Sequence, residues 1–261
     1  MYTISMSVMI ACLICAIITT LLPIIISVVL LVRKKLNVMP YFIGALAFFI
    51  SQICLRMPIM SILSATSKEY VEFTSTMLGA ILVGGLTAGL FEETARLISA
   101  KILLKKDRLS FKDGVSFGVG HALCEVIILV GISMIFNLMV LIMINTDTFY
   151  DLMLATGIKD EQYNQYLNIY TSTQVIDFIY ALMERCSAIM FHIFNTLIVF
   201  YGVKLKKYGY YILAILLHTA FNGLSLVLST YCGVLVTEII LLILSLGGLI
   251  FTITRVKSNL K

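Results

Sequence analysis

Two adjacent glutamates and every histidine of this chain lie within apolar stretches of its sequence. Glu92 and Glu93 form the acidic pair, and His121, His192 and His218 are the three histidines. Two neighbouring carboxylates repel each other, so such a pair can hold an exchangeable proton. A carboxylate of this kind beside a histidine can act as a general acid and base. These residues are therefore the first candidates for chemistry.

The composition is that of an integral membrane protein. Of the 261 residues, 60% are hydrophobic and 13% are charged, and the charged share is about half that of a soluble domain. Seven apolar runs are long enough to cross a bilayer: 4–32, 39–64, 75–104, 114–144, 176–203, 209–229 and 233–254. We expect an all-α, polytopic transmembrane helical bundle. Residues 1–261 would form a single integral-membrane domain, with the motif core at about 75–225.

Basic residues alternate between the loops and set the expected orientation. Clusters that include Arg33, Lys105, Lys204 and Arg255 follow the first, third, fifth and seventh runs. The positive-inside rule places these loops in the cytoplasm. The N-terminus is then outside, the C-terminus is cytoplasmic, and the external loop at about 145–175 would hold an interfacial helix. Because the net charge of +5 comes from these clusters, it does not indicate a nucleic-acid partner.

The candidate residues share one depth in the membrane. Counted from the expected cytoplasmic ends of their runs, Glu92, His121, His192 and His218 all lie about 8–12 residues inside, or ~12–18 Å. Polar groups in a membrane face the bundle interior, away from lipid. We therefore expect these side chains to converge on one cavity in the cytoplasmic half of the bilayer.

Helical spacing adds partners to these residues. Pairs four residues apart are Glu92 and Arg96, Phe117 and His121, His121 and Glu125, and His218 and Asn222. Glycine pairs with the same spacing, at Gly85 and Gly89 and at Gly114 and Gly118, lie on the glutamate and histidine faces and allow close helix packing. Such packing would set the glutamates opposite His121. A structural interpretation fits Arg56, Glu184 and Arg185 better, as a buried ion-pair network.

Three motifs on separate runs carry a family resemblance. FEETARL (91–97) contains Glu-Glu-x-x-x-Arg, FGVGH (117–121) is Phe-x-x-x-His, and HTAFN (218–222) is His-x-x-x-Asn. In this order they resemble the CAAX prenyl protease and bacteriocin-processing family of intramembrane proteases. GHALCE (120–125) and ERCSAIMFH (184–192) are still more similar to its bacterial YhfC branch. The resemblance covers roughly residues 40–225.

The resemblance implies a glutamate-type intramembrane endopeptidase in a bacterial plasma membrane. Glu92 and His121 would activate water, Glu93 would support them, and His218 and Asn222 would stabilise the oxyanion. Arg96 would anchor the glutamate helix. We also expect supporting roles for Phe117, Glu125 and His192, although Glu125 and His192 depart from the core pattern of the family. No cofactor is expected in this mechanism. The substrate would be a membrane protein or a lipidated peptide, met within the lipid bilayer.

Other functional hypotheses stay open beside the glutamate-type endopeptidase. Three histidines, His121, His192 and His218, with a carboxylate could hold zinc, although HExxH spacing is absent. The protein would then be a zinc-dependent intramembrane metalloprotease. Membrane Glu and His chains also serve as proton relays in transporters, but the sequence has no inverted repeat. A non-catalytic immunity or scaffold protein could keep the same fold.

The alternating basic loops predict that residues 108 and 155 lie on opposite sides of the membrane. Single cysteines replacing Arg108 and Ala155, in a background without the six native cysteines, should react with an impermeant thiol reagent from opposite faces. Position 108 should react only from the cytoplasmic side. Labelling of both positions from the same side would contradict this topology.

Overall fold

The structure is a computed structural model of the chain that describes residues 3–105, 109–158, 160–257 and 260; Arg108 therefore lies outside the described residues. The regular structure of the described residues is helical throughout. Within these described ranges, seven segments are long and apolar enough to cross a membrane: Met6–Val32, Val38–Thr66, Met77–Leu103, Phe111–Asn145, Val175–Lys204, Gly209–Cys232 and Val234–Val256. The all-α fold and the seven spans are confirmed. The orientation of the termini stays a prediction.

Apolar side chains are exposed along the spans, as expected for helices that face lipid hydrocarbon. Ile25, Leu216 and Ile243 are 57%, 58% and 63% exposed. The chain folds as two compact units, one of Met1–Ile25 with Val126–Leu182 and one of Ile26–Glu125 with Met183–Lys261. All the candidate site residues belong to the second unit. The single domain expected from the sequence stays a prediction.

The first unit contains the expected external loop. Its elements are most of α1 (Met6–Val32), η3 (Val126–Gly131), α8 (Ile132–Asn145), α9 (Phe149–Ala155), α10 (Asp160–Ser172) and the start of α11 (Val175–Lys204). Two short helices thus replace the one interfacial helix expected. After α9 the chain passes through Gly157, whose φ of 77° favours glycine. Cys12 and Cys15 are buried in the apolar core of this unit, where cysteine behaves as a small hydrophobe.

Two spans of the second unit contain π-helical segments. One of these spans consists of α2 (Val38–Phe48), η1 (Phe49–Arg56) and α3 (Met57–Thr66). The next span consists of α5 (Met77–Ala80), η2 (Ile81–Leu86) and α6 (Thr87–Lys105). The short helix α4 (Lys68–Thr74) lies between the two spans. Pro58 lies in the first turn of α3, two residues after the end of η1. It has no N–H to donate to the carbonyl of Cys54, and its ring would clash with that carbonyl in a regular α-helix. The wider turn of η1 removes this conflict.

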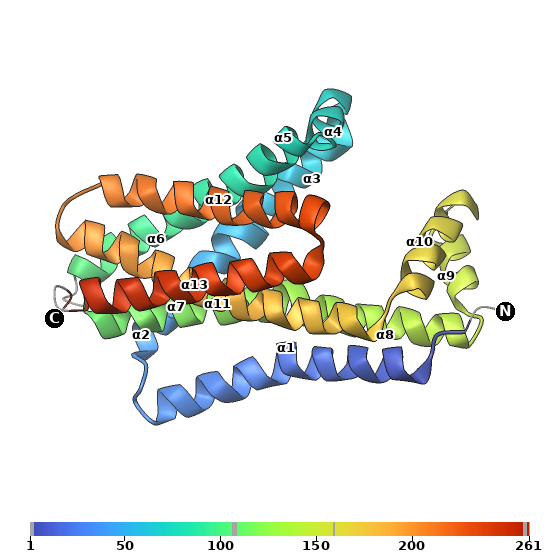
Figure 1. Cartoon of the computed structure of the whole chain (residues 1–261), viewed down its shortest axis with the longest axis horizontal. Helices are drawn as coiled ribbons and strands as arrows, with labels where there is room; N and C mark the ends of the chain where they lie inside the picture. The colour runs from blue at the N-terminus through green and yellow to red at the C-terminus, as the bar shows by residue number, and fades with distance from the viewer. Residues whose placement is uncertain (1–2, 106–108, 159, 258–259, 261) are drawn as a thin grey trace. The chain divides into compact units, whose positions relative to one another are not determined.

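Glycines bring the remaining helices of this unit together. α7 (Phe111–Glu125) crosses α2 so closely that a Cβ atom at Gly44 would lie 2.1 Å from the Phe117 carbonyl oxygen. α12 (Gly209–Cys232) and α13 (Val234–Val256) follow, and Figure 1 shows them antiparallel and side by side. The predicted glycine stripes do allow close packing, but with other partners than expected. Gly85 and Gly89 contact α12, and Gly114 and Gly118 contact α11.

The crossing of α2 and α7 predicts a sharp dependence on glycine. Gly44→Ala would push a methyl group into the Phe117 backbone, and overpacking of this kind lowers the free energy of unfolding by about 1–3 kcal/mol. Gly247→Ala on α13 is the matched control, because a Cβ atom there meets nothing within 4 Å. Thermal unfolding in detergent measures both variants. Equal effects of the two substitutions would contradict the packing described.

Candidate metal centre

Glu92 on α6 and His121 on α7 meet in the interior of the second unit. The Glu92 Oε2 and His121 Nε2 atoms are 2.9 Å apart, and both residues are buried. The Phe48 ring lies edge-on to the imidazole, and Phe117 stacks on it, one turn earlier on the same helix. The predicted proximity of the glutamate and histidine motifs is therefore confirmed, and the aromatic rings restrict how the imidazole can turn.

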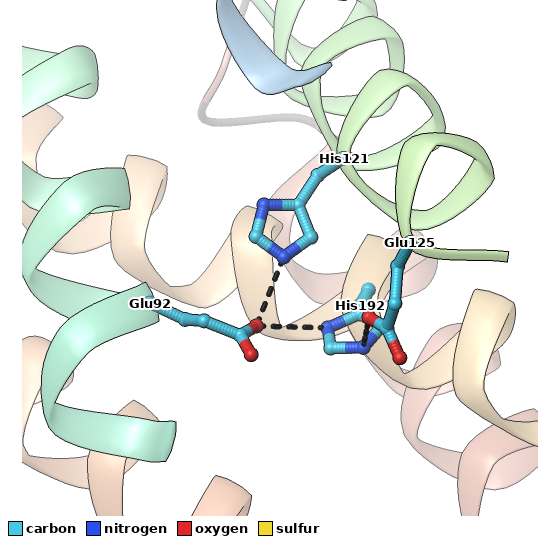
Figure 2. A group of neighbouring side chains, drawn as sticks. All are labelled: Glu92, His121, Glu125 and His192. Atoms are coloured by element: carbon cyan, nitrogen blue, oxygen red, sulfur yellow. Dashed lines mark hydrogen bonds and ion pairs between the residues drawn. The ribbon is translucent and has the colours of Figure 1, made fainter. Parts of the chain in front are cut away.

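A second carboxylate and a second histidine complete the cluster. His192 on α11 places its Nε2 atom 2.7 Å from Glu125 Oε2 and its Nδ1 atom 3.7 Å from Glu92 Oε2. Figure 2 shows the four side chains of Glu92, His121, Glu125 and His192 pointing toward one another from α6, α7 and α11. One ligand atom from each of these buried residues lies within 4.8 Å of all the others.

Arg96 places a buried positive charge beside the cluster. Its guanidinium is fully buried, pairs with Glu93 through Nη1, and lies 3.3 Å from Glu92 Oε2 through Nη2. Nη2 also lies 2.8 Å from His192 Nδ1. Arginine can only donate, so His192 Nδ1 is the acceptor. The proton of a neutral His192 therefore sits on Nε2, facing Glu125.

Glu93 is the centre of a neighbouring network that includes the third histidine. Its Oε1 atom accepts from Arg96, from Asn195 Nδ2 at 2.8 Å and from His218 Nδ1 at 2.8 Å. His218 Nε2 lies 3.9 Å from Glu92 Oε1. The structure thus pairs His218 with Glu93 and groups the other two histidines with Glu92 and Glu125. With its proton on Nδ1, a neutral His218 presents a lone pair on Nε2 and would need a second proton to act as an oxyanion donor.

Asn222 lies apart from this cluster, and Glu125 has a further partner outside it. Asn222 is half-buried, its Cβ atom lies beside Gly85 of η2, and no hydrogen bond joins it to the described residues of the cluster. Glu125 also accepts from Arg185 Nη1 at 3.0 Å, and Arg185 pairs in turn with its neighbour Glu184. An ion-pair network therefore exists in this region, but it is only partly buried, and the contacts of Arg56 are with other residues.

Sequence reasoning missed two buried amides at the site. Asn195 donates to Glu93, and Gln52 Nε2 donates to Glu92 Oε1 at 2.9 Å. Each amide has a spacing signal, because Asn195 lies three residues after His192 and Gln52 lies four before Arg56. Uncharged amides in a span are less conspicuous than charged residues, so these signals were weak.

The donor set fits a zinc ion. Zinc takes imidazole nitrogen and carboxylate oxygen at ~2.0–2.2 Å, and imidazole donors disfavour magnesium and calcium. Two imidazoles and two carboxylates are gathered here, and all four residues are buried. His121 directs Nε2 toward Glu92, and its Nδ1 atom is buried and has no hydrogen-bond partner among the described residues. Of the three histidines of the zinc alternative, His121 and His192 belong to this group, whereas His218 is hydrogen-bonded to Glu93.

The fold and this cluster define a multi-pass membrane protein with a buried histidine–carboxylate site, of the kind that metal-dependent hydrolases use. Residues 18–242 match the family described as YhfC intramembrane metalloprotease, and the chain belongs to this family. It is 30% identical over 185 residues, 70% of each chain, to the uncharacterised membrane protein YhfC of Bacillus subtilis strain 168. No solved structure matches the chain.

These comparisons confirm the YhfC part of the resemblance. They do not support the expectation of a site without a cofactor, because the family is described as metalloproteases. Together with the gathered ligand atoms, they favour the metal alternative. The individual roles of the site residues stay proposals.

The network around Glu93 predicts a structural role that can be separated from the cluster itself. Glu93→Gln removes the charge that Arg96 pairs with, and breaking a buried ion pair lowers the free energy of unfolding by about 3–5 kcal/mol. Glu72→Gln is the control, since Glu72 makes an exposed pair with Lys68 and should lose less than ~1 kcal/mol. Unfolding midpoints in detergent measure the difference. Similar stability of the two variants would contradict the role of Glu93.

Proposed function

We propose that this protein is a zinc-dependent intramembrane endopeptidase that cleaves membrane proteins or membrane-bound peptides. One observation carries the proposal: Glu92, His121, Glu125 and His192 bring four ligand atoms together inside the spans. Charged groups in a membrane-spanning helix are unfavourable by ~2.5–3.5 kcal/mol each or more, so a functional site explains their presence best. The family description supports the same activity.

The four donors divide into ligands and a base. A catalytic zinc site keeps three protein ligands and one open position, so one carboxylate is available for proton transfer. Glu92 Oε2 lies near both imidazoles, at 2.9 Å from His121 and 3.7 Å from His192. Glu125 contacts His192 and is held by Arg185. We assign Glu92, His121 and His192 as ligands and Glu125 as the general base.

Bound zinc would polarise the scissile carbonyl and make water a better nucleophile at neutral pH. Residues of the chain itself transfer the proton and balance the charge. Glu125 takes a proton from water, and it can pass the proton to the leaving amine. Arg96 neutralises part of the negative charge of Glu92 and Glu93. The burial of the cluster strengthens each of these electrostatic effects.

A bound cation would also change the contacts of Arg96. A neutral imidazole has one free lone pair, and His192 uses the lone pair of Nδ1 for Arg96. If His192 served as a ligand through Nδ1, Arg96 would have to release that nitrogen, because its lone pair would then be taken by the metal. Glu93 then remains its buried partner. The same side chain can therefore balance the charge of the site with and without a metal.

The assignment predicts which substitutions remove zinc. His121→Ala, His192→Ala and Glu92→Gln should each abolish stoichiometric zinc in purified protein, because each removes a ligand. Glu125→Gln should retain zinc but lose cleavage of membrane peptides in proteoliposomes. His218→Ala is the control for losing a buried histidine, and it should retain zinc because its hydrogen bond goes to Glu93. Plasma emission spectroscopy measures the metal.

Other outcomes distinguish the alternatives. Zinc lost with Glu125→Gln but kept with Glu92→Gln would exchange the roles of the two carboxylates. Cleavage by a wild-type protein that contains no metal and resists strong chelators would refute the metal site. It would support the glutamate-only mechanism of the CAAX prenyl protease and bacteriocin-processing family, with Glu92 and His121 activating water.

A further inference from the structure

A polar pair on η1 lies directly beside Glu92. Gln52 is 4% exposed, and its Nε2 atom donates to Glu92 Oε1 at 2.9 Å. Arg56, one turn later, donates from Nη1 to Gln52 Oε1 at 3.0 Å. The two residues thus form a chain of hydrogen bonds that ends on a proposed metal ligand.

The chain of bonds fixes the orientation of the Gln52 amide. A guanidinium can only donate, so the amide oxygen must face Arg56 and the amide NH₂ group must face Glu92. A flipped amide would place its NH₂ group against the guanidinium and its oxygen against the carboxylate. Both contacts would then be repulsive. Arg56 therefore ensures that Gln52 presents a donor to Glu92.

Arg56 is itself held by the next span. Its Nε atom donates to Thr87 Oγ1 at 2.8 Å, and Nη2 donates to the carbonyl oxygens of Val83 and Gly84 at 3.2 and 3.0 Å. Val83 and Gly84 belong to η2. One arginine thus joins the two π-helical segments of this unit, and such segments are frequent at functional sites.

The hydrogen bond from Gln52 gives the two carboxylate oxygens of Glu92 different partners. Gln52 occupies Oε1, and Oε2 remains directed at His121 and His192. We propose that Gln52, oriented by Arg56, is a positioning residue that holds Glu92 with one oxygen toward the metal. This inference rests on the proposed metal site. Partners of this kind usually change metal affinity by 10–100-fold when they are removed.

Zinc affinity separates positioning from simple packing. Gln52→Met keeps the size of the side chain and removes the donor, so the Kd for Zn²⁺, measured by competition with a chelator in detergent, should rise about 10–100-fold. Ser51→Ala is the matched control. Ser51 is equally buried, and its hydroxyl donates to the carbonyl of Phe48 on the same helix, so its Kd should match wild type. Gln52→Asn, whose amide is too short to reach Glu92, provides a second variant should the first not fold.

A double-mutant cycle tests whether Arg56 acts through Gln52. Arg56→Lys keeps the charge and loses the forked geometry, so it should weaken zinc binding in the wild-type background. It should add no further loss in the Gln52→Met background, because the residue it orients is already gone. Equal losses in both backgrounds would overturn the relay.

Two failures remain distinguishable. A folded Gln52→Met variant that binds zinc as tightly as a zinc-binding wild type would overturn the role of Gln52 alone. A wild-type protein that binds no zinc would overturn the proposed metal site, and the role of Gln52 with it.

Discussion

The buried guanidinium of Arg96 is the interaction on which the rest of the site depends. A charged group in the membrane interior is unfavourable by several kcal/mol unless it is paired and hydrogen-bonded. Arg96 meets this requirement through Glu92, Glu93 and His192. These contacts hold α6 against α11, and Glu93 extends them to α12 through His218. Helices that must satisfy one another's polar groups have little freedom to shift or rotate.

Close backbone packing makes those contacts possible. Side-chain hydrogen bonds near 2.9 Å require helix axes that are fixed to a fraction of an ångström. Glycine allows the close approach of the helix backbones at three crossings. These are the crossing of α2 with α7, that of η2 and α6 with α12, and that of α7 with α11. The π-helical segments also contribute to this packing. The wider turn of η1 brings Gln52 next to Glu92, and the wider turn of η2 brings its carbonyl groups next to Arg56. Packing and polar satisfaction therefore support the same arrangement.

The sequence predicted the level of the site better than its internal pairing. Counting residues from basic loops gives a position along the membrane normal, and it predicted one level for Glu92 and His121, whose side chains meet in the structure. It gives no rotation about the helix axis, so it could not show that His218 faces Glu93. Glycine spacing marked faces that pack closely but not their partners. Gln52 carries no charge, so the energetic argument that exposed the glutamates did not expose it.

The central claim is that two histidines and a glutamate from three spans hold a metal in the membrane interior. X-ray absorption at the zinc edge of the purified, zinc-loaded protein tests it most directly. The account predicts a first shell of nitrogen and oxygen at ~2.0–2.1 Å, with scattering from two imidazoles. A sulfur shell at ~2.3 Å, which would point to a cysteine such as Cys124 beside Glu125, would contradict the ligand set. So would a shell with three imidazoles, which would place His218 on the metal.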